Sequence, residues 1–166
     1  MISYSPKSFA RHCLELIDKE IVSMMEGLVV VTKIIEKTAK DEIGHYQSAK
    51  GNFPAWAALT DSTVADKEKH GYAPPDNPLL RNGSLRKSIK SETNGLEGIV
   101  GSTSQIMVYH EFGTSKMAMR PVIGPAAFVN KKKIHEIIGL AVVSGFYGKG
   151  MPIHESLGYN FKTDEG

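Results

Sequence analysis

Apolar residues recur at helical spacing along the first forty residues of the chain. They lie three or four positions apart, at Ala10, Leu14, Ile17, Ile21, Met24, Leu28, Val31 and Ile35. This spacing is typical of a heptad seam on one long helix. Ser5 and Pro6 suit the cap and first position of that helix, which we expect to reach about Asp41. At 1.5 Å per residue it would measure roughly 50 Å, so it needs a partner chain or other segments of its own chain alongside it.

Residues 44–82 break this pattern and are expected to form an extended arm. Gly, Pro, Asn and Asp recur there, and the run from Ala73 to Pro78 is rich in proline, which favours extended backbone. The only tryptophan, Trp56, also lies in this segment. A purely solvated loop gains nothing from so large an apolar side chain. We therefore expect the arm to dock on a surface, and to be mobile in the free subunit and ordered on assembly.

The sequence after the arm predicts a hairpin. Asn94-Gly95 separates two strand-like runs, and pairing outward from this dipeptide places Ile89 opposite Val100. Residues 105–112 suit either a third strand or a short helix. Gly124-Pro125 then opens a second helix, which ends near Gly145.

These elements together predict an α+β fold. We expect a long N-terminal helix, an extended arm, an antiparallel hairpin or small sheet, and a C-terminal helix packed on the sheet. One domain would span residues 1–150 with the arm inserted at about 44–82. Residues 151–166 would form a polar C-terminal tail.

Charge and composition give few indications of function. The 20 Lys and Arg residues against 18 Asp and Glu give a net charge of +2. So small a net charge does not indicate a nucleic-acid-binding protein with a strongly basic surface. The run Lys131, Lys132 and Lys133 suits a solvated helix face, with a contact to DNA phosphates as the alternative. A single cysteine excludes an internal disulfide, and no apolar run is long enough to cross a membrane.

No catalytic or metal-binding pattern stands out. His70, His110, His135 and His154 lie near carboxylates, but no pair has the i, i+4 spacing of a helical zinc motif. Scattered surface histidines explain them better. Since no nucleophile and base are paired in any known motif, we expect no enzyme activity, no catalytic residue, no metal and no cofactor.

The segment from Tyr109 to Pro121 is the most informative part of the chain. It reads as a tightly turned loop, in which Gly113 permits a sharp change of backbone direction and Thr114 or Ser115 can bond nearby amides. Arg120 carries a planar fork suited to a carboxylate, and Glu111 is the nearest candidate, in the same chain or a neighbour.

Three blocks of sequence, in order, resemble the neck and tail-component proteins of lambdoid long-tailed bacteriophages. The first is Trp56-Ala57-Ala58-Leu59, followed by Thr63 and Lys67. The second runs from Pro78 through Leu85 to Ile89, with Asn82 where the family usually has threonine. The third is Val100-Gly101-Ser102, then Glu111-Phe112-Gly113-Thr114 and Arg120-Pro121. The resemblance covers about residues 53–128 and departs from the family at Val122, where phenylalanine is common.

This resemblance implies a structural protein of the virion neck, at the head-to-tail junction. Such a protein would form a homo-oligomeric ring that joins or completes the tail around the DNA channel. Its partners would be a head-side connector or stopper and tail-side terminator or tube proteins, with non-specific DNA contact through Lys131 to Lys133 and no membrane. It would assemble in the bacterial host cytoplasm and reside in the virion.

The loop and its matching blocks are expected to lie at a subunit interface, and a core-side turn that stabilises the monomer is the alternative. The interface residues would be Trp56, Leu85, Glu111, Phe112, Gly113, Thr114, Arg120 and Pro121. Two further functions stay open: a tail-terminator or minor tail protein, and a DNA-binding accessory protein.

Overall fold

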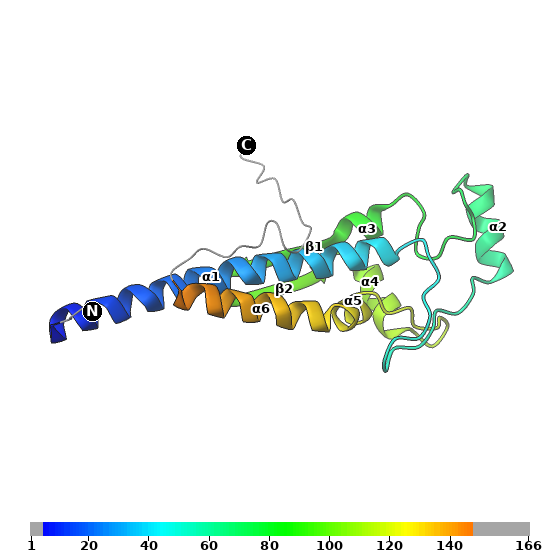
Figure 1. Cartoon of the computed structure of the whole chain (residues 1–166). Helices are drawn as coiled ribbons and strands as arrows, with labels where there is room; N and C mark the ends of the chain where they lie inside the picture. The colour runs from blue at the N-terminus through cyan, green and yellow to red at the C-terminus, as the bar shows by residue number, and fades with distance from the viewer. Residues whose placement is uncertain (1–4, 148–166) are drawn as a thin grey trace. The chain divides into compact units, whose positions relative to one another are not determined.

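The computed structural model describes residues 5–147 and confirms the α+β class. The long N-terminal helix α1 (Pro6–Glu42), the antiparallel hairpin of β1 (Ile89–Asn94) and β2 (Glu97–Ser102), and the C-terminal helix α6 (Lys131–Phe146) are all present (Figure 1). Four shorter helices lie between them: α2 (Asp61–Lys69), α3 (Ser84–Ser88), α4 (Gln105–Phe112) and α5 (Ile123–Val129). The expected tail at 151–166 lies outside the described residues.

Helix α1 begins and ends close to where its sequence predicts. The Ser8 amide donates to Ser5 Oγ at 3.2 Å, so Ser5 caps the helix ahead of Pro6. The helix spans 37 residues, which corresponds to roughly 55 Å.

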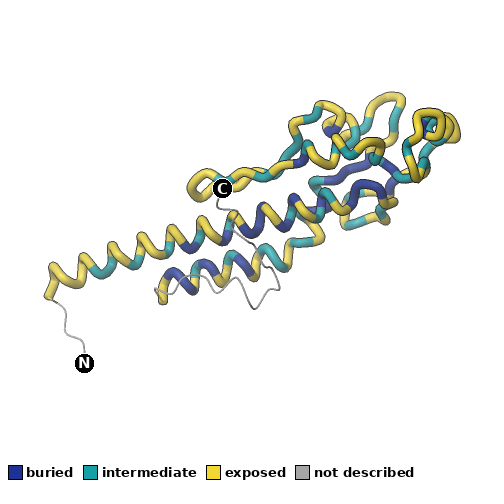
Figure 2. Tube along the Cα trace, turned by 90° about the horizontal axis from the view of Figure 1, so that it is seen from above, coloured by how far each residue is buried: buried dark blue, intermediate teal, exposed yellow. Residues whose placement is uncertain are grey.

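Two opposite faces of α1 are apolar or small, and only one of them is buried. Ser23, Gly27, Val30 and Ile34, spaced by four, three and four, form the buried face. Leu14, Ile17 and Ile21 of the predicted seam are instead 63%, 51% and 40% exposed. At 100° per residue, Leu14 and Ser23 lie about 180° apart around the helix. In Figure 2, the N-terminal part of α1 is largely exposed, and buried residues recur along the rest of the helix.

The described chain divides into two compact units. The first holds residues 5–31, 93–97 and 133–147, and the second holds residues 32–92 and 98–132. Helix α1, the hairpin and α6 each contribute to both units, so the single domain over residues 1–150 stays a prediction.

In the first unit, α6 approaches α1 very closely. A β-carbon on Gly145 would lie 2.4 Å from Glu20 Cα, so only glycine fits there. Ala141 and Ser144 of α6 are buried as well. Small side chains thus allow the backbones of these two helices to come close together.

The second unit holds a hydrophobic core to which α1, the arm, β1, α4 and α5 all contribute. Its buried members are Ala39, Ile43, Trp56, Ile89, Met107, Val122 and Ala126. Each of these elements contributes one or two side chains to the core, so the core ties the arm to the helices around it.

The hairpin is confirmed, but its predicted register is wrong by two residues. Gly95 and Leu96 lie between the strands, and the Thr103 amide donates to the Ser88 carbonyl at 3.1 Å. This register places Val100 opposite Ser91 and not opposite Ile89. Gly95 has φ 57° and Leu96 has a negative φ, as in a type II′ turn, where glycine takes the first central position.

Three further elements differ from the sequence-based expectations or complete them. The arm contains helix α2, which its weak apolar pattern did not predict. Residues 105–112 form helix α4, so the third strand is excluded. The single C-terminal helix is in fact α5 and α6, which are separated at Asn130. The Asn130 amide group donates to Ala126 O at 2.8 Å and to Thr38 Oγ1 at 2.9 Å, which fixes this break against α1.

Candidate functional site

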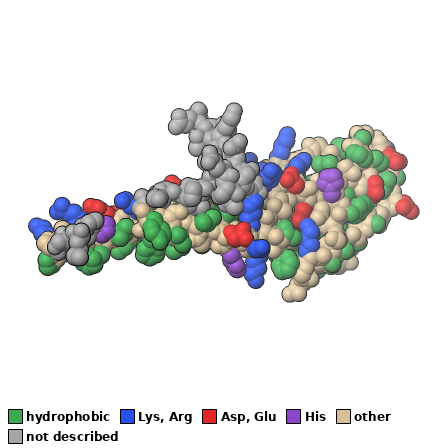
Figure 3. All heavy atoms as spheres, viewed as in Figure 1, with side chains coloured by type: hydrophobic (Ala, Val, Ile, Leu, Met, Phe, Trp, Pro, Cys, Tyr) green, Lys and Arg blue, Asp and Glu red, His purple; other side chains and the backbone are tan. Residues whose placement is uncertain are grey.

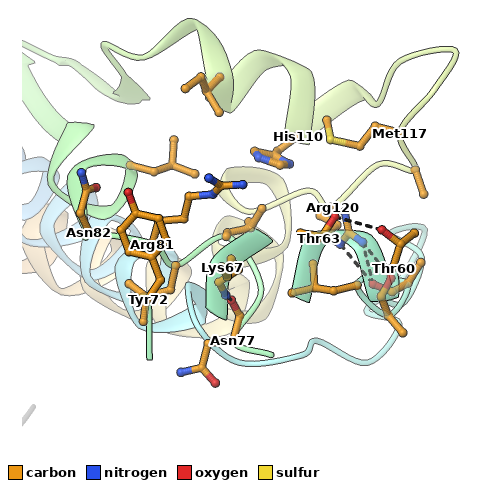
Figure 4. A pocket seen from close by; sticks show the side chains of 18 of the residues that line it. Thr60, Thr63, Lys67, Tyr72, Asn77, Arg81, Asn82, His110, Met117 and Arg120 are labelled. Carbon is orange, nitrogen blue, oxygen red and sulfur yellow. Dashed lines mark hydrogen bonds between the residues drawn. The ribbon is translucent and has the colours of Figure 1, made fainter. Parts of the chain in front are cut away.

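The loop after α4 meets the arm through Arg120. The Arg120 side chain is buried, and its Nε and Nη2 donate to Ala57 O at 3.1 and 2.9 Å. Nη2 also donates to Ala58 O at 3.1 Å, as the dashed lines in Figure 4 indicate. A planar guanidinium can bridge two successive carbonyls in this way, so Arg120 holds the arm against the loop.

Glu111 lies near Arg120 in sequence but binds a different partner. Its Oε2 accepts hydrogen bonds from the Val122 and Ile123 amides at 2.8 and 3.3 Å, and its Oε1 accepts one from the Gly124 amide at 3.0 Å. The predicted Glu111–Arg120 pairing within the chain is therefore wrong. The carboxylate caps the free amides at the start of α5, while the guanidinium binds carbonyls.

Trp56 anchors the arm in the core of its own chain. Its ring is only 6% exposed, and its Nε1 donates to Pro121 O at 2.9 Å. Phe53 lies edge-on to Phe128 at 6.3 Å between ring centroids, beside Gly124. The expected docking of the arm is present. A single chain already buries Trp56, and the expected ordering of the arm on assembly stays a prediction.

The turn at Gly113 has the geometry that the sequence predicts. Gly113 has φ 73°, and a β-carbon there would lie 3.0 Å from Met119 N and 3.1 Å from Met117 O. The Thr114 and Met117 backbones pair at 2.9 and 3.3 Å, and Thr114 Oγ1 accepts a bond from the Lys116 amide at 3.3 Å. A residue with a side chain would strain this turn.

The remaining motif residues divide between the interior and the surface. Leu85 packs against the core cluster, and Pro121 is buried. Phe112, by contrast, is 74% exposed at the end of α4. A subunit interface at this loop stays a prediction, and Phe112 is accessible to such a partner.

The three predicted DNA-contacting lysines lie at the start of α6. Lys131 and Lys132 are exposed, and Lys133 is half-buried. DNA contact through them stays a prediction.

A cavity of about 740 Å³ lies beside the clamp formed by Arg120. Four cationic side chains line it, namely Lys67, Arg81, Lys116 and Arg120. Figure 4 shows three of them, Lys67, Arg81 and Arg120, together with His110. Its walls also include the apolar side chains of Leu59, Leu79, Leu80, Ile106 and Met117. No Asp or Glu is among the described residues that line it.

Two groups on the cavity wall have a lowered pKa. Burial lowers the pKa of Lys67, and the nearby charge of Arg81 lowers it further. Lys67 is 2% exposed, and its Nζ donates to Asn77 O at 2.6 Å. Burial and then the charge of Arg120 lower the pKa of His110, so its imidazole is neutral at pH 7. The buried Nδ1 of His110 has no hydrogen-bond partner in the described structure.

Sequence reasoning missed this cavity. His110 belongs to it and is half-buried, which corrects the expectation of a surface histidine, whereas His70 is exposed as expected. Lys67 lies in a charged helix, where nothing marks it as buried. The only available signal was its position eleven residues after Trp56, within the first block of the resemblance.

Comparisons with protein-family models, with curated proteins and with solved structures found no match. Within residues 5–147, no three His, Cys, Asp or Glu side chains gather where they could hold a metal ion. No helix in the described part is both long and apolar enough to span a membrane.

Proposed function

We propose that the chain is a structural protein of the bacteriophage neck, located in the virion at the head-to-tail junction. It would assemble in the host cytoplasm into a homo-oligomeric ring around the DNA channel, between a head-side connector or stopper and tail-side terminator or tube proteins. The sequence blocks around Trp56, Leu85 and Glu111 to Pro121 support this placement. They resemble neck and tail-component proteins of long-tailed phages.

The observation that carries an assembly role is the second apolar face of α1. Leu14, Ile17, Ile21 and Met25 share this face and are all exposed, although the opposite face of the same helix is already buried. Figure 3 shows hydrophobic side chains gathered along the N-terminal part of α1. A helix that is apolar on both sides is normally covered on both sides.

A second copy of the chain is the occupant that fits this face best. Burial of apolar surface contributes about 25 cal/mol per Å², so a helix of this length offers a substantial interface. Head-to-tail contacts that repeat around an axis close into a ring. The ring would also repeat the exposed Phe112 and the lysines of α6 on every subunit.

Electron microscopy and sedimentation of the full chain test this proposal. We expect closed rings of uniform diameter, and we expect antibody labelling of purified virions at the junction between head and tail. Labelling along or at the far end of the tail would support a minor tail protein instead. A chain that stays monomeric at high concentration, and binds duplex DNA with a steep salt dependence, would favour the accessory DNA-binding function.

A further inference from the structure

Two buried cations line the same cavity without a carboxylate partner. Lys67 is 2% and Arg120 is 7% exposed, and neither forms an ion pair within residues 5–147. Their described side-chain hydrogen bonds go to the neutral carbonyls of Asn77, Ala57 and Ala58. Buried charges are costly to a fold unless they are paired, so this arrangement is unusual for a purely structural site.

Two carboxylates in the neighbouring segments bind other groups, although the charge of Asp76 also acts on Lys67. Asp66 pairs with Arg81 at 2.9 Å, and both side chains are about half exposed. Asp76 accepts a hydrogen bond from Tyr46 Oη at 2.7 Å. The described residues that line the cavity therefore carry an excess of positive charge.

We propose that this cavity binds an acidic segment of a partner protein, with a carboxylate against its cationic wall and an apolar side chain against its apolar wall. The cations supply the charge complement, and Leu59, Leu79, Ile106 and Met117 supply an apolar surface. A cavity of about 740 Å³ accommodates a few residues. The choice of a protein as the occupant rests on the proposed assembly function.

Duplex DNA fits the cavity poorly. Its phosphates lie on a wide, rigid cylinder and are contacted by side chains that project from a surface. Lys67 and Arg120 are almost wholly buried in the wall of a concavity, which a single carboxylate side chain can enter and a duplex cannot. The apolar wall also has no counterpart on a phosphate backbone.

Fluorescence anisotropy with the full chain tests the inference. The probe is a fluorescein-labelled pentapeptide, Gly-Leu-Glu-Leu-Gly, and its match has Gln in place of Glu. We expect the Glu peptide to bind at least tenfold more tightly than the Gln peptide. We expect Lys67→Met to weaken that binding at least tenfold, while Lys69→Met, an exposed lysine on the same helix, changes it less than twofold. Equal binding of the two peptides would overturn the inference, as would displacement by a DNA duplex at equal phosphate concentration.

A second measurement does not depend on the fold of any variant. Titration of the wild-type chain with the Glu peptide should shift the imidazole NMR signals of His110, on the cavity wall, and leave those of exposed His70 in place. Unchanged His110 signals at saturation would contradict the site. Rings that form without any peptide binding would overturn this inference alone, whereas peptide binding without rings would overturn the proposed ring.

Discussion

The Arg120 side chain donates three hydrogen bonds to two carbonyl oxygens of the arm. We predict that Arg120→Lys lowers the free energy of unfolding by about 1–3 kcal/mol, because a lysine ammonium cannot reproduce the planar fork. Trp56 emission should shift toward the red, since the arm beside Ala57 would loosen. Urea denaturation followed by Trp56 fluorescence measures both effects.

Arg86 provides the matched control for this clamp. It is exposed and pairs with Asp41 at 3.0 Å, so Arg86→Lys should change stability by less than about 0.5 kcal/mol. If Arg120→Lys kept full stability but abolished assembly, the interface interpretation of Arg120 would be preferred to the internal clamp.

Glu36 makes the stability of the second unit sensitive to acid. Burial raises the pKa of its carboxyl, but hydrogen bonds from Lys40 and Ser91 and the charges of Lys33 and Lys40 together lower that pKa to about 2. A pKa below the ordinary 4.5 means that the charged form stabilises the fold above pH 4.5, and that this contribution is lost as the pH falls toward 2. We predict that Glu36→Gln lowers the free energy of unfolding at pH 7 by on the order of 1–3 kcal/mol. The stability of this variant should also depend less on pH between about 2 and 4.5. Thermal melting across this range measures it.

Glu42 gives a comparison of opposite sign. Burial raises the pKa of its carboxyl, opposed by the Lys50 hydrogen bond and charge and assisted by the charge of Glu111. Its contribution to stability is therefore present at low pH and lost as the pH rises through the raised pKa. In Glu42→Gln, the fall in stability as the pH rises through the raised pKa of Glu42 should disappear. The fall in stability at acid pH that is due to Glu36 should remain. Identical pH profiles for the two variants would contradict both assignments.

At the scale of elements, Gly145 controls how closely α6 approaches α1. A β-carbon there would lie 2.4 Å from Glu20 Cα, in backbone that cannot move aside cheaply. We predict that Gly145→Ala destabilises the chain by about 1–3 kcal/mol, because the two helices must separate. Gly139 lies on the same helix with nothing within 4 Å of its added β-carbon, so Gly139→Ala should instead stabilise the chain by about 0.5–1 kcal/mol. Melting temperatures that move in the same direction for both variants would refute the close contact.

Elements that local chemistry specifies could be predicted from the sequence. Ser5 and Pro6 mark the start of α1, and Asn94-Gly95 marks the hairpin, because capping and tight turns depend on a few neighbouring residues. The hairpin register needed the φ of Gly95, which sequence alone does not give. Helix α2 was missed because its buried side is the stem of Lys67 and not a row of apolar residues.

The candidate site was predicted less completely than the fold. The turn at Gly113 follows from its own sequence, and the structure gives this glycine a φ of 73°. The partners of Arg120 and Glu111 were not predictable, because their choice depends on which backbone groups the arm and α5 bring near them. The cavity depends on residues from Ala57 to Arg120, which only the folded chain brings together.

At the scale of the whole molecule, the exposed face of α1 gives the sharpest test of assembly. We predict that the double variant Leu14→Glu, Ile17→Glu remains folded but sediments as a monomer, because two carboxylates would have to be buried in the interface. Both residues are exposed, so the stability of the subunit should change by no more than about 0.5 kcal/mol per site. Lys19→Glu is the control: it changes the net charge by the same −2, is exposed, and lies roughly 140° around the helix from Leu14. Rings that persist in the double variant, or that disappear equally in Lys19→Glu, would show that this face does not hold the assembly together.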